Sequence, residues 1–127
     1  MSEKINNKLI KFIKPDFVHS DERGKLRQIS SNGKWKQINV ITSSKGLTRG
    51  NHYHKHNREA FFIIYGKFNL ILENGKEKEK YIIKAEDFFI IEPNTIHTFE
   101  FLEDTTLVAL YDKGVEEENG KKDIYSN

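Results

Sequence analysis

Residues 46–66 read GLTRGNHYHKHNREAFFIIYG, and this stretch decides the fold. Side chains at positions i and i+2 of a β-strand lie on the same face, so His52 and His54 point together if the stretch is extended. Glu59 then opens an apolar run, residues 60–65, rich in the aromatic and β-branched residues that strands favour. Gly66 follows this run and marks a turn. The stretch therefore predicts a polar strand that carries two imidazoles, then an acid, then a buried strand.

Short apolar runs separated by Gly, Asn and Asp continue on both sides of this stretch. Asn74-Gly75 lies between two such runs, and Asn-Gly is a strong hairpin signal. No stretch keeps a 3.6-residue apolar period over three turns. Many short strands with turn residues between them predict an all-β antiparallel sandwich or barrel. The expected strands are Leu9–Ile13, Leu26–Ile29, Trp35–Thr42, Ala60–Tyr65, Phe68–Glu73, Lys80–Lys84, Phe88–Glu92, His97–Phe101 and Thr105–Asp112.

Composition narrows the class of protein. The chain of 127 residues has the length of one domain, which we expect to cover residues 1–127. Its 21 Lys and Arg against 19 Asp and Glu give a net charge of +2, which favours neither nucleic acid nor a membrane surface as a partner. Cysteine is absent, so disulfides and thiolate metal ligands are excluded. No apolar run is long enough to span a membrane and residues 1–14 lack a signal-peptide pattern, so we expect a cytoplasmic protein.

A second polar segment completes a candidate metal site. His97 follows a turn at Pro93, beyond the apolar run 88–91. Two imidazoles, a carboxylate and a distant third imidazole can close around a divalent metal, so His52, His54, Glu59 and His97 are the candidate ligands. Nitrogen and oxygen donors suit zinc first, with iron, manganese or nickel as alternatives.

The spacing of these residues resembles the first motif of the cupin superfamily. That motif is Gly, five residues, His-x-His, three or four residues, Glu, six residues and Gly, and residues 46–66 match it in full. The second motif is looser: Pro93 and His97 are present with one residue fewer between them, and Asp87 stands where its first glycine is expected. The resemblance covers residues 46–101. It implies a single-domain antiparallel β-barrel of jelly-roll type, with the site inside its mouth.

Two segments carry a narrower resemblance, to cupins that act on sugar nucleotides. Residues 21–26, DERGKL, are similar to their Asp-x-Arg-Gly-x-hydrophobic signature. Residues 49–55, RGNHYHK, are similar to the C-terminal cupin domain of capsular-polysaccharide sugar-nucleotide reductases and to the dTDP-4-keto-6-deoxyhexose 3,4-ketoisomerases. The first group implies a bound metal, and the second implies paired histidines that shuttle protons without one. The ketoisomerases lack an acid at the position of Glu59, which favours the metal-bearing group.

These resemblances imply an isomerase or epimerase of a nucleotide-linked 4-keto-6-deoxy sugar in surface-polysaccharide biosynthesis. Moving a proton alpha to a ketone needs a base of near-neutral pKa, so His52 and His54 are the catalytic candidates. A diphosphate needs cations, and arginine can offer phosphate two parallel hydrogen bonds. Only four arginines occur beside 17 lysines, so Arg49 and Arg23, one in each motif, are the candidates for binding a dTDP- or UDP-linked substrate.

Two other functions use the same residues: a non-catalytic cupin that binds a metal or a sugar, and a metal-dependent dioxygenase. Resemblance of fold does not choose between reactions.

Two further expectations concern association with a second chain and the C-terminal tail. Barrel edges need covering and Leu9–Ile13 has no obvious partner strand nearby, so we expect a homodimer formed through exchanged N-terminal or edge strands. The polar tail, residues 114–127, is expected to be partly disordered or to pair with a partner subunit.

Overall fold

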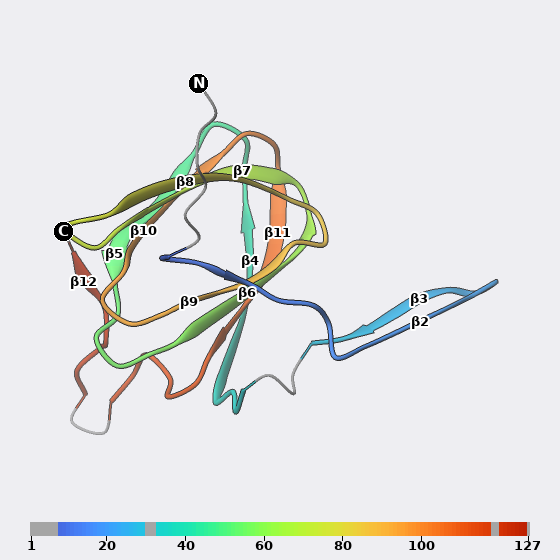
Figure 1. The fold of residues 1–127 in the computed structure, drawn as a ribbon, viewed down its shortest axis with the longest axis horizontal. Helices are drawn as coiled ribbons and strands as arrows, with labels where there is room; N and C mark the ends of the chain where they lie inside the picture. The colour runs from blue at the N-terminus through green and yellow to red at the C-terminus, as the bar shows by residue number, and fades with distance from the viewer. Residues whose placement is uncertain (1–7, 30–32, 118–119, 127) are drawn as a thin grey trace.

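The computed structural model describes residues 8–29, 33–117 and 120–126, and within these ranges all regular structure is β. The strands form two five-stranded antiparallel sheets, in the orders β1-β9-β6-β11-β4 and β12-β5-β10-β7-β8, and a separate hairpin of β2 and β3 (Figure 1). Among these residues there is no helix with the length and hydropathy needed to cross a membrane. The strands are β1 (Lys11–Phe12), β2 (Phe17–Asp21), β3 (Gly24–Gln28), β4 (Gln37–Ser43), β5 (Thr48–Tyr53), β6 (Glu59–Tyr65), β7 (Lys67–Glu73), β8 (Lys78–Lys84), β9 (Phe88–Ile91), β10 (Ile96–Phe101), β11 (Thr105–Tyr111) and β12 (Tyr125–Ser126).

The two sheets pack face to face around an aromatic core. Burial alternates along β7, β8 and β10, as expected for strands with one face toward the core. Phe61 of β6 packs across the interior on Phe99 of β10, with ring centroids 5.2 Å apart, and Phe99 stacks on Phe68 of β7 at 4.9 Å. The expected jelly-roll is therefore present as a sandwich, since the described strands form two sheets and not one closed ladder.

The sheet that contains β6 and β9 is covered on its outer face as well. Ala60, Phe62, Phe88, Ile90 and Leu110 form a second buried cluster, against which Ile13, Ile29, Trp35 and Val108 pack. This cover explains why residues 60–63 of β6 and all of β9 are apolar and buried, whereas burial alternates along β7, β8 and β10 of the other sheet.

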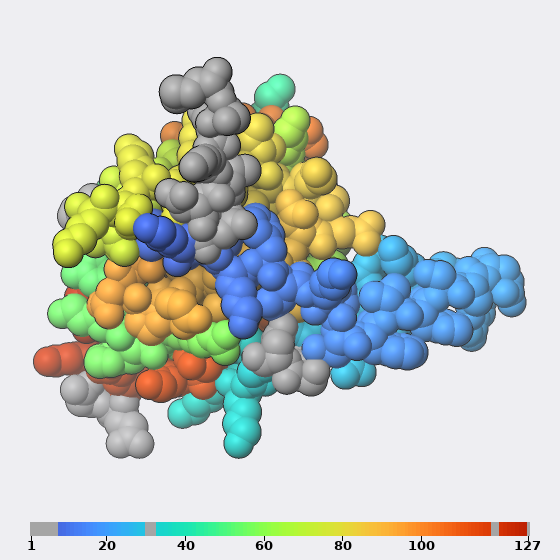
Figure 2. All heavy atoms as spheres, in the orientation of Figure 1, coloured from blue at the N-terminus to red at the C-terminus, as the bar shows by residue number. Residues whose placement is uncertain are grey.

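The hairpin of β2 and β3 extends away from both sheets (Figures 1 and 2). Phe17, Val18 and Leu26 are 53%, 46% and 57% exposed on it. An isolated two-stranded hairpin is at best marginally stable in water, because it has no second layer on which to bury its apolar side chains. The sequence analysis finds only the second strand of this hairpin, Leu26–Ile29.

Each expected strand overlaps an observed one, and the ends differ by two residues at most. The strands that the apolar pattern misses are β2, β5 and β12, which are short or polar. The tail also differs from expectation in its described part, because Tyr125 and Ser126 pair with Tyr53 and His52 of the same chain. The C-terminal strand is thus part of the sheet that carries the histidines.

Candidate functional site

A β-bulge in β5 sets the direction of the side chains that enter the site. His52 lies opposite His97 of β10 and Gly50 lies opposite the next residue of β10, which leaves Asn51 unpaired. Asn51 and Gly50 have positive φ angles of 59° and 99°. A Cβ atom on Gly50 would lie 2.5 Å from the backbone oxygen of His97, so only glycine fits there. The extra residue places Arg49 on the same face as His52, where a regular strand would turn it to the other face.

The opposite sheet supplies an acid and a phenol. Glu59 of β6 pairs directly with Tyr111 of β11, and both side chains are buried between the sheets. The Tyr111 ring meets the ring of His54 edge-on, with centroids 5.6 Å apart. The polar groups are thus gathered at one end of the sandwich, while Phe68 and Phe101 fill the interior farther along β7 and β10.

Three imidazoles and one carboxylate meet at this end. His52, His54 and His97 each bring one ring nitrogen to within 4.8 Å of the other two. Glu59 Oε1 lies 3.1 Å from His54 Nε2 and 3.5 Å from His97 Nε2. The structure therefore brings together all four residues that the sequence predicts as a metal-binding set.

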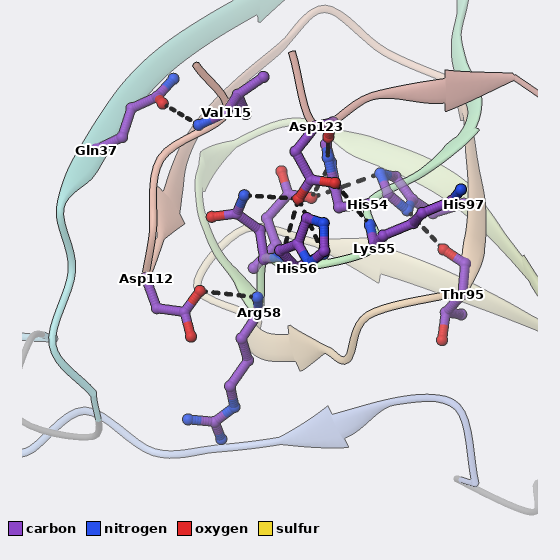
Figure 3. Close-up of polar contacts among 12 residues, drawn as sticks. Gln37, His54, Lys55, His56, Arg58, Thr95, His97, Asp112, Val115 and Asp123 are labelled. Atoms are coloured by element: carbon purple, nitrogen blue, oxygen red, sulfur yellow. Dashed lines mark hydrogen bonds and ion pairs between the residues drawn. The ribbon is translucent and has the colours of Figure 1, made fainter. Parts of the chain in front are cut away.

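Backbone oxygens fix the orientation of the two most buried imidazoles. His54 Nδ1 lies 2.5 Å from the backbone oxygen of Asp123, and His97 Nδ1 lies 3.1 Å from that of Thr95 (Figure 3). A carbonyl oxygen can only accept, so Nδ1 carries the proton in both rings. The Nε2 atom of each ring is then left with its lone pair and faces Glu59.

Burial and neighbouring charges shift the pKa values of the three histidines in different directions. Burial and the imidazoles of His97 and His54 lower the pKa of His52 to about 4. Burial also lowers the pKa of His97. Burial alone would lower the pKa of His54, but the Glu59 carboxylate outweighs it and raises that pKa. At neutral pH, His52 and His97 are therefore uncharged, and His54 is the imidazole that holds a second proton most readily.

Glu59 and Tyr111 hold opposite protonation states. Burial would raise the pKa of Glu59, but His54 and His97 outweigh it and lower that pKa, so the carboxyl group is ionised. Burial and the charge of Glu59 raise the pKa of Tyr111 far above its ordinary value. The Tyr111 hydroxyl thus stays protonated and donates a hydrogen bond to Glu59.

The donor set fits a divalent cation. His54 Nε2 and Glu59 Oε1 are buried and, although 3.1 Å apart, neither has a hydrogen-bond partner of acceptable geometry among the described residues. Buried polar atoms seldom lack a partner, and a bound ion is one explanation when they do. Histidines that bind metals usually donate the other ring N–H to a carbonyl or carboxylate, as His54 and His97 do here.

A cavity of about 820 Å³ opens over these residues. Imidazoles and Glu59 form its polar part, and β4 supplies one wall through residues 37–41. Its lining contains two cations, Arg49 of β5 and Lys122 of the C-terminal segment, and both are exposed. Glu116 lies in the same lining and is also exposed. The site thus combines a buried acid–base or metal-binding group with cations that solvent and ligands can reach.

Arg23, the other arginine predicted to bind substrate, is not among the residues that line this cavity. It lies near the turn of the β2–β3 hairpin, where its Nη2 atom donates to Asp21 Oδ2 at 2.6 Å and its side chain is 80% exposed. The carboxylate two residues away holds the guanidinium at the hairpin. Within one chain, Arg49 and Arg23 therefore do not form one binding site.

Three residues of the site carry no signal that the sequence analysis used. Tyr111 ends the last expected strand, and its inward direction follows from pairing with Glu59, which the sequence alone does not give. Lys122 and Asp123 lie in the polar tail, where charged residues ordinarily indicate solvent exposure. The fold places Lys122 in the lining of the cavity and Asp123 against His54, next to the ladder between β12 and β5.

Similar folds occur among enzymes of sugar-nucleotide metabolism. The TDP-quinovose 3,4-ketoisomerase of Campylobacter jejuni is 21% identical, with 94% of each chain covered and a TM-score of 0.81. A double mutant of the 3,4-ketoisomerase of Thermoanaerobacterium thermosaccharolyticum, in complex with TDP, is 25% identical, with 94% of this chain and 88% of that one covered and a TM-score of 0.77. The capsular polysaccharide assembling protein of Staphylococcus aureus is 22% identical, with 87% of this chain and 33% of that one covered and a TM-score of 0.65.

No curated protein sequence matches the chain. A protein family does match: residues 19–112 match the polysaccharide biosynthesis C-terminal domain, a span that includes most of the hairpin, the bulged strand and all four predicted metal ligands. Because the match covers most of the chain, this protein belongs to the family of the polysaccharide biosynthesis C-terminal domain.

Proposed function

We propose that the protein is an isomerase or epimerase that moves a proton next to the ketone of a nucleotide-linked 4-keto-6-deoxy sugar, in surface-polysaccharide biosynthesis. The observation that carries this proposal is the cavity in which His52 and His54 lie beside two exposed cations, Arg49 and Lys122. The imidazoles suit proton transfer at carbon, and the cations suit a nucleotide diphosphate. The similar 3,4-ketoisomerase that holds TDP supports the same substrate class.

We assign the proton to His52 and the metal to His54, Glu59 and His97. One ring nitrogen cannot bind a proton and a metal at the same time, so the two roles predicted for His52 exclude each other. His54, Glu59 and His97 are all at most 3% exposed, and the two imidazoles have backbone acceptors on Nδ1. His52 is less buried and lines the cavity. A divalent metal, zinc first, would stabilise negative charge on the substrate oxygen when bound.

The reaction then needs one base. His52 takes the proton from the carbon next to the ketone, although its pKa of about 4 is below the near-neutral value expected of such a base, so the ring becomes an imidazolium and the substrate an enolate. In a ketoisomerisation, the old carbonyl carbon receives the proton held by His52, and the proton of the neighbouring hydroxyl moves to the old carbonyl oxygen, so the ketone moves by one position. In an epimerisation, water in the cavity gives a proton to the original carbon from the opposite face, and His52 releases its proton to solvent. Both outcomes conserve atoms and electrons, and Arg49 and Lys122 hold the diphosphate meanwhile.

Product analysis tests this function. The purified protein is incubated with TDP- and UDP-linked 4-keto-6-deoxyglucose, and NMR of the sugar protons identifies a shifted ketone or an inverted carbon. We expect a new product with wild type and at least a 10²-fold slower reaction with His52→Asn, the lower figure for a general base. Tight nucleotide binding without any product would favour a non-catalytic binding protein. Oxygen uptake by iron-loaded protein would favour a dioxygenase.

We also propose that the protein is a homodimer that acts in the cytoplasm. Phe17, Val18 and Leu26 are exposed on a hairpin that extends from the sheets, and the edge strand β4 exposes Ile38 and Val40 at 62% and 68%. A second copy of the chain would cover such apolar side chains and an open sheet edge. Light scattering should give the mass of two chains, and Leu26→Asp should shift it toward one; a monomeric wild type contradicts the proposal.

A further inference from the structure

The described parts of the C-terminal segment, residues 114–117 and 120–126, contact both sheets at the end where the site lies. Val115 N donates to Gln37 Oε1 of β4 at 2.7 Å, which attaches the segment to one sheet. β12 pairs with β5 of the other sheet. Between these attachments Asp123 N donates to Val115 O at 2.7 Å, so the segment folds back on itself. The tail is thus built into the wall of the cavity.

The Asp123 carboxylate holds the loop that follows the paired histidines. Its Oδ1 accepts the backbone N–H of Lys55 at 2.8 Å. Its Oδ2 accepts the backbone N–H groups of His56 and Asn57, both at 3.0 Å, and the Asn57 Nδ2 group at 2.8 Å (Figure 3). Asp123 is completely buried, and these donors lower the pKa of its carboxyl group, although burial acts the other way.

These four hydrogen bonds also argue against a second metal site at Asp123. His56, Glu117 and Asp123 bring ligand atoms to within 4.8 Å of one another, as in a second metal site. The Asp123 oxygens, however, already accept four N–H donors, three of them on Oδ2 and one on Oδ1. The cluster therefore serves to attach the loop to the tail, not to bind an ion.

The backbone oxygen of Asp123 accepts the proton on His54 Nδ1 at 2.5 Å. One residue thus makes both contacts: its side chain fixes the loop next to His54, and its carbonyl fixes the ring of His54. Because the carbonyl cannot donate, it requires a proton on Nδ1, so the neutral form of His54 keeps its lone pair on Nε2. That lone pair faces Glu59 Oε1 at 3.1 Å.

We propose that Asp123 is a positioning residue that selects the tautomer and the direction of the His54 ring. This inference rests on the proposed function, since it states how His54 is prepared for its part in that reaction. When the carboxylate is removed, the loop 55–57 loses four hydrogen bonds and the carbonyl is no longer held against Nδ1. His54 can then carry its proton on Nε2, where it blocks the atom that faces Glu59.

The test uses three variants of the full chain, in metal-free form for the NMR and with metal present for the kinetics. Asp123→Ala removes all four side-chain hydrogen bonds, and Asp123→Asn keeps the size and one acceptor oxygen. Glu117→Gln is the matched control, because Glu117 also joins the tail to this loop, through His56 at 3.6 Å, but lies outside the contacts of His54. Nitrogen-15 NMR of labelled histidine, at a pH where the rings are neutral, reports which nitrogen of His54 holds the proton. The His54→Gln spectrum identifies the signal.

We expect the proton on Nδ1 in wild type and in Glu117→Gln. In Asp123→Ala it should move to Nε2 in a large share of molecules, with a smaller effect in Asp123→Asn. The kcat on the keto sugar should fall about 10–100-fold in Asp123→Ala with little change in KM, as for other partners that orient a histidine ligand. If Asp123→Ala does not fold, the His54 tautomer and the kcat of Asp123→Asn alone test the inference. A folded variant that keeps the Nδ1 proton and wild-type kcat overturns the inference.

The two readouts separate this inference from the proposed function. A tautomer shift in Asp123→Ala, with wild type inactive on every keto sugar, contradicts the proposed reaction and leaves the role of Asp123 in place. An active wild type, with an unchanged tautomer in the variants, contradicts the role of Asp123 and leaves the reaction in place.

Discussion

Arg49 and His52 face the same cavity although they are three positions apart on one strand. A regular strand would place them on opposite faces, and the bulge at Asn51 removes that conflict. The proposed diphosphate cation and the proposed base are thus adjacent because one residue of β5 has no partner on β10. The Arg-Gly-x-His spacing in the sequence corresponds to this bulge, since its third position is the unpaired Asn51.

Gly50 should be essential to this arrangement. Gly50→Ala forces a Cβ to within 2.5 Å of the His97 backbone oxygen and is strained at a φ of 99°. Gly46→Ala is the matched control, since its φ is 89° but no atom lies within 4 Å of the new Cβ. We expect Gly46→Ala to lower the free energy of unfolding by about 1 kcal/mol and Gly50→Ala by clearly more, with lost activity. If urea titrations show that both variants lose the same free energy of unfolding, the steric role of Gly50 is refuted.

Arg49 should bind the nucleotide. Arg49→Ala is expected to weaken TDP or UDP binding by roughly 1.5–3 kcal/mol, the range for hydrogen bonds to charged groups, with the fold intact because the side chain is exposed. Arg23→Ala is the comparison, since that guanidinium lies on the hairpin and not in the cavity of its own chain. Calorimetric titration measures both. Unchanged affinity in Arg49→Ala contradicts the diphosphate assignment.

Glu59 should be a metal ligand. Glu59→Gln is expected to lose metal and activity together, because an amide oxygen is a poorer ligand than a carboxylate. Metal analysis of untagged protein should give about one divalent ion per wild-type chain, with affinity falling at acid pH as the imidazoles protonate. Glu79→Gln controls for removing a buried carboxylate, because Glu79 accepts from Tyr81 and Leu9 away from the site. Full activity of metal-free Glu59→Gln would favour a reaction carried by histidines alone.

His52 should make the metal-free protein less stable in acid. Its pKa is about 4 in the folded state and about 6.5 when unfolded, so between these values the unfolded chain binds the extra proton. Stability attributable to this group is therefore present above pH 6.5 and lost as the pH falls toward 4. His52→Gln should remove about one proton from the pH dependence of unfolding in this window. Identical slopes for variant and wild type would show that the folded imidazole titrates normally.

The sequence predicts the sandwich and the four candidate ligands because both depend on short-range patterns. Alternating apolar residues give β7, β8 and β10, and the spacing between His52, His54 and Glu59 is fixed by one strand and its loop. The position of Arg23 and the roles of Tyr111 and Asp123 depend on pairings between distant segments. Such pairings leave no periodic signal, and a polar tail that is buried by hydrogen bonds has the same composition as one that is solvated.

Proton exchange at the carbon next to the ketone tests the central claim most directly. The wild-type protein is mixed with TDP-4-keto-6-deoxyglucose in deuterated water, and the C3 proton is followed by NMR beside His52→Asn and a protein-free sample. The account predicts that wild type replaces this proton with deuterium, whichever product forms, and that His52→Asn does so at least 10²-fold more slowly. A C3 proton that persists with wild type as long as without protein, while TDP binds, would contradict it.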